Sequence, residues 1–146
     1  MGLLKILQHP DKRLRKKAKP VKKIDKKIQK IIHDMLETMY KKKGIGLAAT
    51  QVNIHLQIIV IDITKDKKKP IILINPKKTY EYGIIQIEES CLSISNVTKN
   101  INRSHIIKIE ALNYYGQKTK ISAKDLLSIC IQHEMDHLQG KLLIDY

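Results

Sequence analysis

Two histidines and a glutamate, His133, Glu134 and His137, form a His-Glu-x-x-His motif near the end of the chain. We predict that residues 122–140 are one helix, on which side chains four apart lie on the same face. Both imidazoles can then reach a single metal ion, and Glu134 lies beside that ion, where a general base for a water molecule is needed. The motif therefore predicts a metal-dependent hydrolase.

The surrounding residues set the limits of this helix. Ser122 and Asp125 resemble a capping box with Asp in the place of Glu, and Gly140 lies where a helix ends. An ordinary amphipathic helix is the alternative interpretation, but the motif is surrounded by apolar side chains: Leu126, Leu127, Ile129, Cys130, Ile131 and Leu138. These predict a helix that is buried on most sides, and buried polar groups need a partner such as a metal ion.

A catalytic zinc-type site has three protein ligands, so a third one is needed. Cys130 shares the face of the histidines, but it lies about 10.5 Å from His137 along the helix axis, too far for a short thiol side chain. Cys91 is on a separate segment without this constraint, so we expect Cys91 as the ligand and Cys130 in the core or a pocket wall. A carboxylate ranks second as the third ligand: Glu88, Glu89 or Glu110.

The segment around Cys91, residues 88–93, holds two acidic residues, a thiol and two hydroxyls without clean periodicity. This composition indicates a functional site. A thiolate combined with two imidazoles suits Fe2+, Zn2+, Co2+ or Ni2+ and disfavours Mg2+ and Ca2+.

The chain has 146 residues, which is enough for one domain with a real core and no disulfide. No stretch has the apolar length needed to span a bilayer, and the first eight residues are too short and too soon interrupted by charge for a secretory signal. We therefore expect a cytoplasmic protein with no membrane contact. Its two cysteines then serve as a ligand or core residue rather than as a disulfide.

The net charge of +14 is concentrated at the start of the chain, because residues 1–43 contribute +11 of it. Such a basic segment implies an acidic partner, most commonly RNA. A lysine-rich solvated surface is the alternative. The abundance of Lys, Ile and Asn, with no Trp or Phe, also fits a coding bias across a whole genome.

A second helix is predicted from the cap residue Asp25 to about Lys43, with Gly44 ending it. Its core face repeats at intervals of three and four: Ile28, Ile31, Ile32, Met35, Leu36 and Met39. The following residues 44–51 are small except for the amide Gln51, and they form either a plain loop or a place of close backbone approach.

The remaining hydrophobic runs predict strands. Residues 58–61 and 71–74 form a hairpin through a charged turn, and residues 106–112 pair with residues 117–121 about a Tyr-Tyr-Gly turn. A weaker strand is predicted at residues 80–87. The fold class is therefore α+β, with mixed, mainly antiparallel sheets packed around the C-terminal motif helix.

Three stretches, in this order, resemble the bacterial-type peptide deformylases. The family motif Gly-x-Gly-x-Ala-Ala-x-Gln matches residues 44–51, Glu-Gly-Cys-Leu-Ser matches residues 89–93, and His-Glu-x-x-His matches residues 133–137. The resemblance covers nearly the whole chain. It implies a single deformylase domain over residues 1–146 that lacks the basic C-terminal helix of longer members.

The resemblance implies removal of the N-formyl group from the initiator methionine of nascent polypeptides, with release of formate. Cys91, His133 and His137 would bind one divalent metal ion, Fe2+ in the cell, with Zn2+, Ni2+ or Co2+ as alternatives. Glu134 would move protons, and the Gln51 side chain and the Leu92 backbone N–H would stabilise the oxyanion.

When the family's motifs are matched position by position to this sequence, two sets of residues are expected to bind the substrate. The family's methionine pocket matches Ile45, Ile87, Glu89, Leu126, Ile129, Cys130 and His133. The segment 44–46, which contains Gly46, matches the edge along which the peptide adds as an extended strand. Ser90, which we also expect to contact the substrate, stands where the family has Gly, so a left-handed backbone at this position would be strained by its Cβ. Ser95 stands where many members have Pro.

Two other functions are set against this one. A general zinc peptidase would need a longer open groove. A weakly active or non-catalytic family member that binds the ribosome or RNA has only Ser90 and the missing tail in its favour. For the deformylase we expect a monomer, whose lysine face over residues 12–43 takes over part of the contact that the C-terminal helix of longer members makes with ribosomal RNA.

Overall fold

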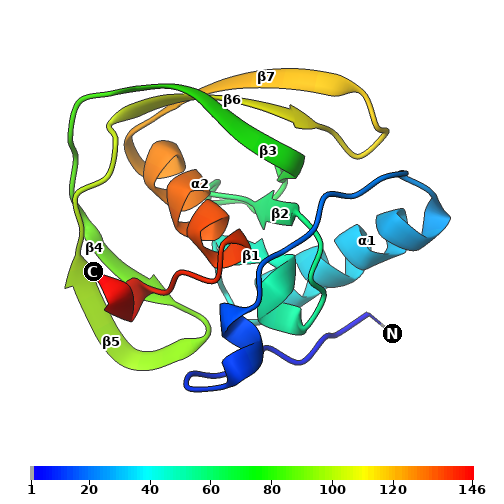
Figure 1. Cartoon of the computed structure of the whole chain (residues 1–146), viewed down its shortest axis with the longest axis horizontal. Coiled ribbons are helices and arrows are strands. Elements are labelled where there is room, and N and C mark those ends of the chain that lie inside the picture. Colours follow the sequence, from blue (N-terminus) through cyan, green and yellow to red (C-terminus); the bar gives the residue numbers. More distant parts are fainter. Residues whose placement is uncertain (1) are drawn as a thin grey trace.

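The computed structural model describes residues 2–146, which form two α-helices and two antiparallel sheets (Figure 1). The larger sheet has the order β1-β2-β3-β6-β7, and β4 and β5 form the smaller one. The helices are α1, Lys26–Lys41, and α2, Asp125–Leu138. The strands are β1 Gly46–Ala48, β2 Ile58–Ile61, β3 Ile71–Tyr82, β4 Glu88–Cys91, β5 Ile94–Asn100, β6 Ile106–Leu112 and β7 Lys118–Lys124. Short 3₁₀ helices cover Lys12–Arg15 (η1), Ala49–Val52 (η2) and Leu143–Asp145 (η3). This arrangement confirms the α+β fold class.

Helix α1 forms where the cap and the apolar period predict it. The Asp25 side chain accepts a hydrogen bond from the Ile28 N–H at 3.0 Å, and Ile32 and Met39 are fully buried. The predicted end at Gly44 is wrong, because the helix stops at Lys41 and Lys43 adopts the left-handed conformation with φ 58°. Lys43 therefore takes the left-handed conformation at the end of the helix that is usually adopted by a glycine.

The two predicted hairpins are confirmed as β2–β3 and β6–β7. The separate strand predicted at residues 80–87 is wrong, because β3 continues from Ile71 to Tyr82 along β6. Two register shifts interrupt this long pairing and let a single strand bend along its partner. The small β4–β5 hairpin, which carries Cys91, was not predicted as strands.

The start of α2 differs from the prediction. Ser122 lies in β7 opposite Lys108, and α2 begins at Asp125 with no side-chain cap at Lys124. Pairing of β7 with β6 therefore prevails over the local capping signal. The predicted end is confirmed, because Gly140 has φ 77° just after the helix and a Cβ there would lie 2.3 Å from the Arg15 carbonyl oxygen.

Helix α2 packs against the large sheet, with Ile129, Ile131 and Leu138 buried (Figure 1). Residues of α2 line a cavity together with residues of β1 and β4, so the fold places three separate segments around one space. Cys91 and Cys130 are free thiols. Within the described residues, α1 and α2 both fall short of what a transmembrane helix requires in length and hydrophobicity.

Substituting Asp25→Ala should lower the free energy of unfolding by about 1 kcal/mol, because the Ile28 N–H loses its acceptor at the N-terminus of α1. Urea denaturation followed by circular dichroism measures this loss. The exposed neighbour Lys27→Ala is the control. A loss of the same size in both variants would contradict the capping role.

Candidate active site

The structure brings together the three predicted metal ligands. Cys91 ends β4, and His133 and His137 lie one turn apart on the buried face of α2. Their ligand atoms all lie within 4.8 Å of one another, and Cys91 Sγ is 3.3 Å from His137 Nε2. Donor atoms around a tetrahedral ion with bonds of about 2.0–2.3 Å are separated by about 3.5 Å, so the cluster has the spacing that such an ion needs.

The chemistry of the donors also fits a metal. A thiolate and two imidazoles are the ligands of borderline divalent ions such as Zn2+ and Fe2+. Burial, followed by the positive charge of His133, lowers the pKa of His137 to about 3. His137 is therefore a neutral imidazole at pH 7, which is the form that binds metals. Its Nδ1 atom is buried with no hydrogen-bond partner among the described residues.

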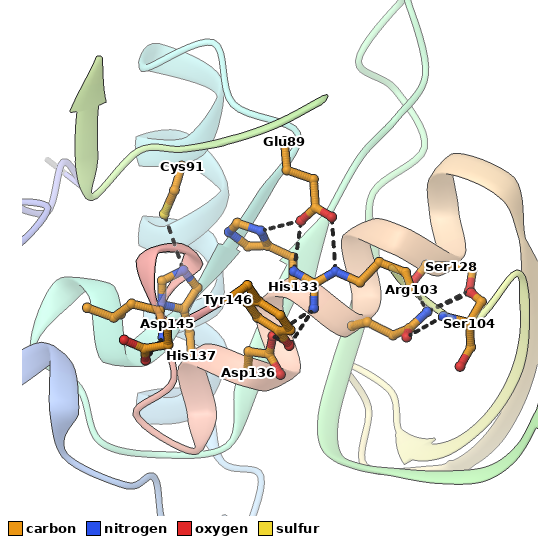
Figure 2. A network of polar contacts seen from close by, with 12 residues as sticks. Glu89, Cys91, Arg103, Ser104, Ser128, His133, Asp136, His137, Asp145 and Tyr146 are labelled. Atoms are coloured by element: carbon orange, nitrogen blue, oxygen red, sulfur yellow. Dashed lines mark hydrogen bonds and ion pairs between the residues drawn. The ribbon is translucent and has the colours of Figure 1, made fainter. Parts of the chain in front are cut away.

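The orientation of His133 is fixed by Glu89. His133 Nδ1 lies 3.1 Å from Glu89 Oε1, and an ionised carboxylate only accepts hydrogen bonds, so Nδ1 carries a proton (Figure 2). Nε2 is then the nitrogen that can bind a metal ion once it has lost its own proton. Burial alone would raise the pKa of Glu89, but hydrogen bonds from His133 and Arg103 outweigh it and keep the pKa below its ordinary value. Glu89 is therefore charged and buried, and Arg103 pairs with it.

Glu134 lies beside the cluster and is buried. Its Oε1 atom has no partner among the described residues, and burial raises the pKa of this carboxyl to about 7. The other oxygen faces Gly46 of β1, where an added Cβ would lie 2.7 Å from Glu134 Oε2. The glycine thus leaves the space in which the carboxylate of Glu134 is placed.

Gln51 is held at both ends of its amide. On η2, with its side chain buried, its Oε1 accepts from the Ala48 N–H at 2.9 Å. Its Nε2 donates to Ser93 Oγ at 3.1 Å and lies 3.7 Å from Cys91 Sγ. The NH₂ group therefore points at the thiol side of the cluster. Leu92 lies between Cys91 and Ser93, directly after β4.

A cavity of about 330 Å³ adjoins the cluster. Every residue that the sequence assigned to substrate binding lines it: Ile45, Gly46, Ile87, Glu89, Ser90, Leu126, Ile129 and Cys130. Gln51, Leu92 and Glu134 line it too, and Lys43 was not foreseen. Burial raises the pKa of the Cys130 thiol to about 12, so it is a neutral wall residue.

The alternative carboxylate ligands do not fit the cluster. Glu110 is exposed on β6, 3.9 Å from Lys120, and is wrong as a ligand. Glu88 is exposed at the cavity, and both oxygens of Glu89 are used by Arg103 and His133. The Glu89 carboxylate therefore contacts the candidate ligand His133 and is itself occupied by hydrogen bonds.

Sequence reasoning missed Arg103, Asp136 and Tyr146, and it gave Ser93 no role of its own. A signal for Arg103 was present, because the chain holds 28 Lys and Arg, of which only three are Arg and only Arg103 lies beyond residue 15. Arginine is favoured where a buried carboxylate is bound by two parallel hydrogen bonds. An arginine far from the other two in a lysine-rich chain is thus a signal for such a pair.

Comparison with known proteins identifies the family. The family model described as Polypeptide deformylase matches residues 3–146. The chain belongs to the peptide deformylase family.

Relatives and solved structures agree with this. The chain is 60% identical over 146 residues to the peptide deformylase of Buchnera aphidicola from Acyrthosiphon pisum, covering 100% of this chain and 84% of the relative. It is 50% identical to that of Nitrosococcus oceani, covering 100% and 87%. The peptide deformylase structure from Legionella pneumophila has a TM-score of 0.95 at 43% identity, covering 98% and 85%. That from Ehrlichia chaffeensis in complex with actinonin has 0.96 at 36%, covering 100% and 89%.

The two cysteines of this deformylase provide a matched test of the metal centre. Loss of a residue that hydrogen-bonds to a metal ligand typically weakens metal binding by roughly 10- to 100-fold. Cys91→Ala removes a ligand itself and should weaken the binding of Zn2+ or Co2+ by more than this. Cys130→Ala should leave it unchanged, because that thiol lines the cavity wall. Metal content after gel filtration and competition with a chelator measure both. Retained binding in Cys91→Ala would remove this cysteine from the ligand set.

Proposed function

We propose that the protein is a hydrolase that removes the N-formyl group from the initiator methionine of nascent polypeptides and releases formate. The observation that carries this is the cluster of Cys91, His133 and His137, with the buried Glu134 and a cavity of about 330 Å³ beside it. Membership of the peptide deformylase family gives the cluster its reaction.

Cys91, His133 and His137 hold one divalent ion in this proposal, with Sγ and two Nε2 atoms as the donors. Fe2+ is the proposed ion in the cell, and Zn2+, Ni2+ or Co2+ suit the same donors. When bound, the ion supplies Lewis acidity, which polarises the formyl carbonyl and lowers the pKa of a neighbouring water to about 7.

Glu134 is the group that moves protons. A carboxyl with a pKa of about 7 can take a proton and give it up at neutral pH, which is the condition for efficient general acid–base catalysis. It first takes the proton of the attacking water and then gives it to the departing amine. Its Oε1, buried without a partner among the described residues, is available for both steps.

The oxyanion is stabilised by two donors in this proposal, the Gln51 side-chain NH₂ and the Leu92 backbone N–H. Gln51 is already held by Ala48 and Ser93, so little reorganisation is needed when charge develops. The loss of one donor of this kind typically costs about 3–4 kcal/mol of barrier.

Peptide binding follows from the position of β1. It is the edge strand of the large sheet, and among residues 2–146 it pairs with β2 alone. Its other edge can therefore accept an extended peptide along Gly46 and Ile45. The methionine side chain enters the cavity among Ile87, Leu126 and Ile129. A cavity of about 330 Å³ suits one side chain and a formyl group. A general peptidase would need a longer open groove.

The non-catalytic alternative has little support. Ser90, which replaces the glycine of the family, is exposed and lies in β4 without a positive φ. A Cβ is therefore accommodated at this position without backbone strain.

The function is tested with anaerobically purified protein whose metal content is measured. Formyl-Met peptides should be hydrolysed, while an internal peptide bond of the same peptide should not. Glu134→Ala should retain its metal and lose activity. Equal turnover by Glu134→Ala would remove this residue from the mechanism, and cleavage of internal bonds would favour the peptidase.

Gly46→Ala should lower deformylation strongly with little loss of stability, because its Cβ must displace the carboxylate of Glu134 from a distance of 2.7 Å. A double-mutant cycle separates this cause from others. Adding Gly46→Ala to Glu134→Ala should change the residual activity little. If the two losses simply multiply, Gly46 acts by another route.

We further propose that the protein is a cytoplasmic monomer that contacts the ribosome through the lysines of residues 12–43. All the lysines in that range are exposed. Affinity for ribosomes should then fall steeply between roughly 50 and 200 mM salt, by about 10³-fold if six phosphates are contacted. Sedimentation with ribosomes measures it, and an affinity independent of salt would contradict the electrostatic contact.

A further inference from the structure

Arg103 connects the candidate metal centre with a second group of polar residues. Arg103 is 5% exposed, and its guanidinium uses three nitrogens. Nε and Nη2 donate to the two oxygens of Glu89 at 3.0 and 2.8 Å, and Nη1 donates to Asp136 Oδ2 at 2.7 Å and to Tyr146 Oη at 3.0 Å (Figure 2). The charge of Arg103 is thus shared between a carboxylate that touches His133 and one that does not.

Tyr146 closes the far end of this group. Its hydroxyl donates to Asp136 Oδ2 at 2.6 Å while it accepts from Arg103, and its ring centre lies 4.9 Å from the Arg103 Cζ atom. Tyr146, Asp136 and Arg103 therefore form a closed triangle of contacts, which restricts the guanidinium more than any one contact would.

The chain before Tyr146 is itself anchored. Leu143 is buried, the Asp145 carboxylate accepts from the Leu142 N–H at 2.8 Å, and Asp145 pairs with Arg15. These contacts hold η3 in place, and Tyr146 follows η3 directly, with its hydroxyl at Asp136. The hydroxyl is therefore in a defined place although the ring is partly exposed.

We propose that Tyr146 and Asp136 are positioning residues for the metal centre. They hold the Nη1 end of Arg103, so that its other two nitrogens fix Glu89, and Glu89 in turn aims Nε2 of His133 at the ion. This rests on the proposed role of His133 as a ligand. Arg103 has a long and flexible side chain, so without the triangle its pairing with Glu89 costs more side-chain entropy and His133 is held less firmly.

The test uses Tyr146→Phe, which removes only the hydroxyl, and Asp136→Asn, which keeps the shape of the side chain. Tyr115→Phe is the matched control, since that ring is 75% exposed in the turn between β6 and β7. Chelator competition should show Co2+ affinity about 10-fold lower in the first two variants. The absorption bands of bound Co2+ should also change, which a loss of stability alone would not cause. Tyr115→Phe should match the parent.

The route through Glu89 is tested in a Glu89→Gln background. Adding Tyr146→Phe there should weaken Co2+ binding no further, because the link to His133 is already altered. An unchanged Co2+ affinity and spectrum in Tyr146→Phe, with or without a lower melting temperature, would overturn the proposal, as would an undiminished effect in the Glu89→Gln background. These experiments measure Co2+ affinity and the Co2+ spectrum, whereas the proposed function is tested by deformylation in the parent protein, so failure of one can be told from failure of the other.

Discussion

The site depends on one buried ion pair, that between Glu89 and Arg103. A carboxylate removed from water is costly unless it is paired and its lone pairs accept hydrogen bonds, and removing one partner of such a pair typically costs about 3–5 kcal/mol. Here both oxygens of Glu89 are satisfied by Arg103 and His133. The same carboxylate therefore orients His133, a candidate metal ligand, and joins β4 to the segment before β6.

Around this pair, the fold brings together segments that are far apart in sequence. Helix α2 supplies imidazoles at a spacing set by the helix itself, while Cys91 arrives from a hairpin outside the large sheet. The edge strand β1 and α2 approach closely because β1 has a glycine where Glu134 lies, as the contact between Gly46 and Glu134 demonstrates. As a result, the carboxylate of Glu134, the amide of Gln51 and the candidate ligands lie close together in a largely buried space.

Much of this could be predicted from local patterns, and the parts that could not are long-range. Some features depend only on neighbouring residues and could therefore be predicted: the apolar period of three and four in α1, the hydrophobic runs of β2 and β3, and the His-Glu-x-x-His motif. The start of α2 was predicted wrongly because Ser122 pairs with Lys108 across a hairpin. The β4–β5 hairpin was missed because most of its residues are exposed and it lacks an alternating apolar pattern. Arg103 meets Glu89 across 14 positions, a separation that no capping or periodicity rule covers.

The shortness of β1 has a consequence for how a substrate would bind and a product would leave. An edge of three residues offers hydrogen bonds only to the backbone of a peptide, and backbone groups are the same in every protein. If a peptide adds along β1 as proposed, recognition beyond its first side chain would rest on backbone groups and would depend little on sequence. So short an edge would also hold the product through few hydrogen bonds, which favours its release.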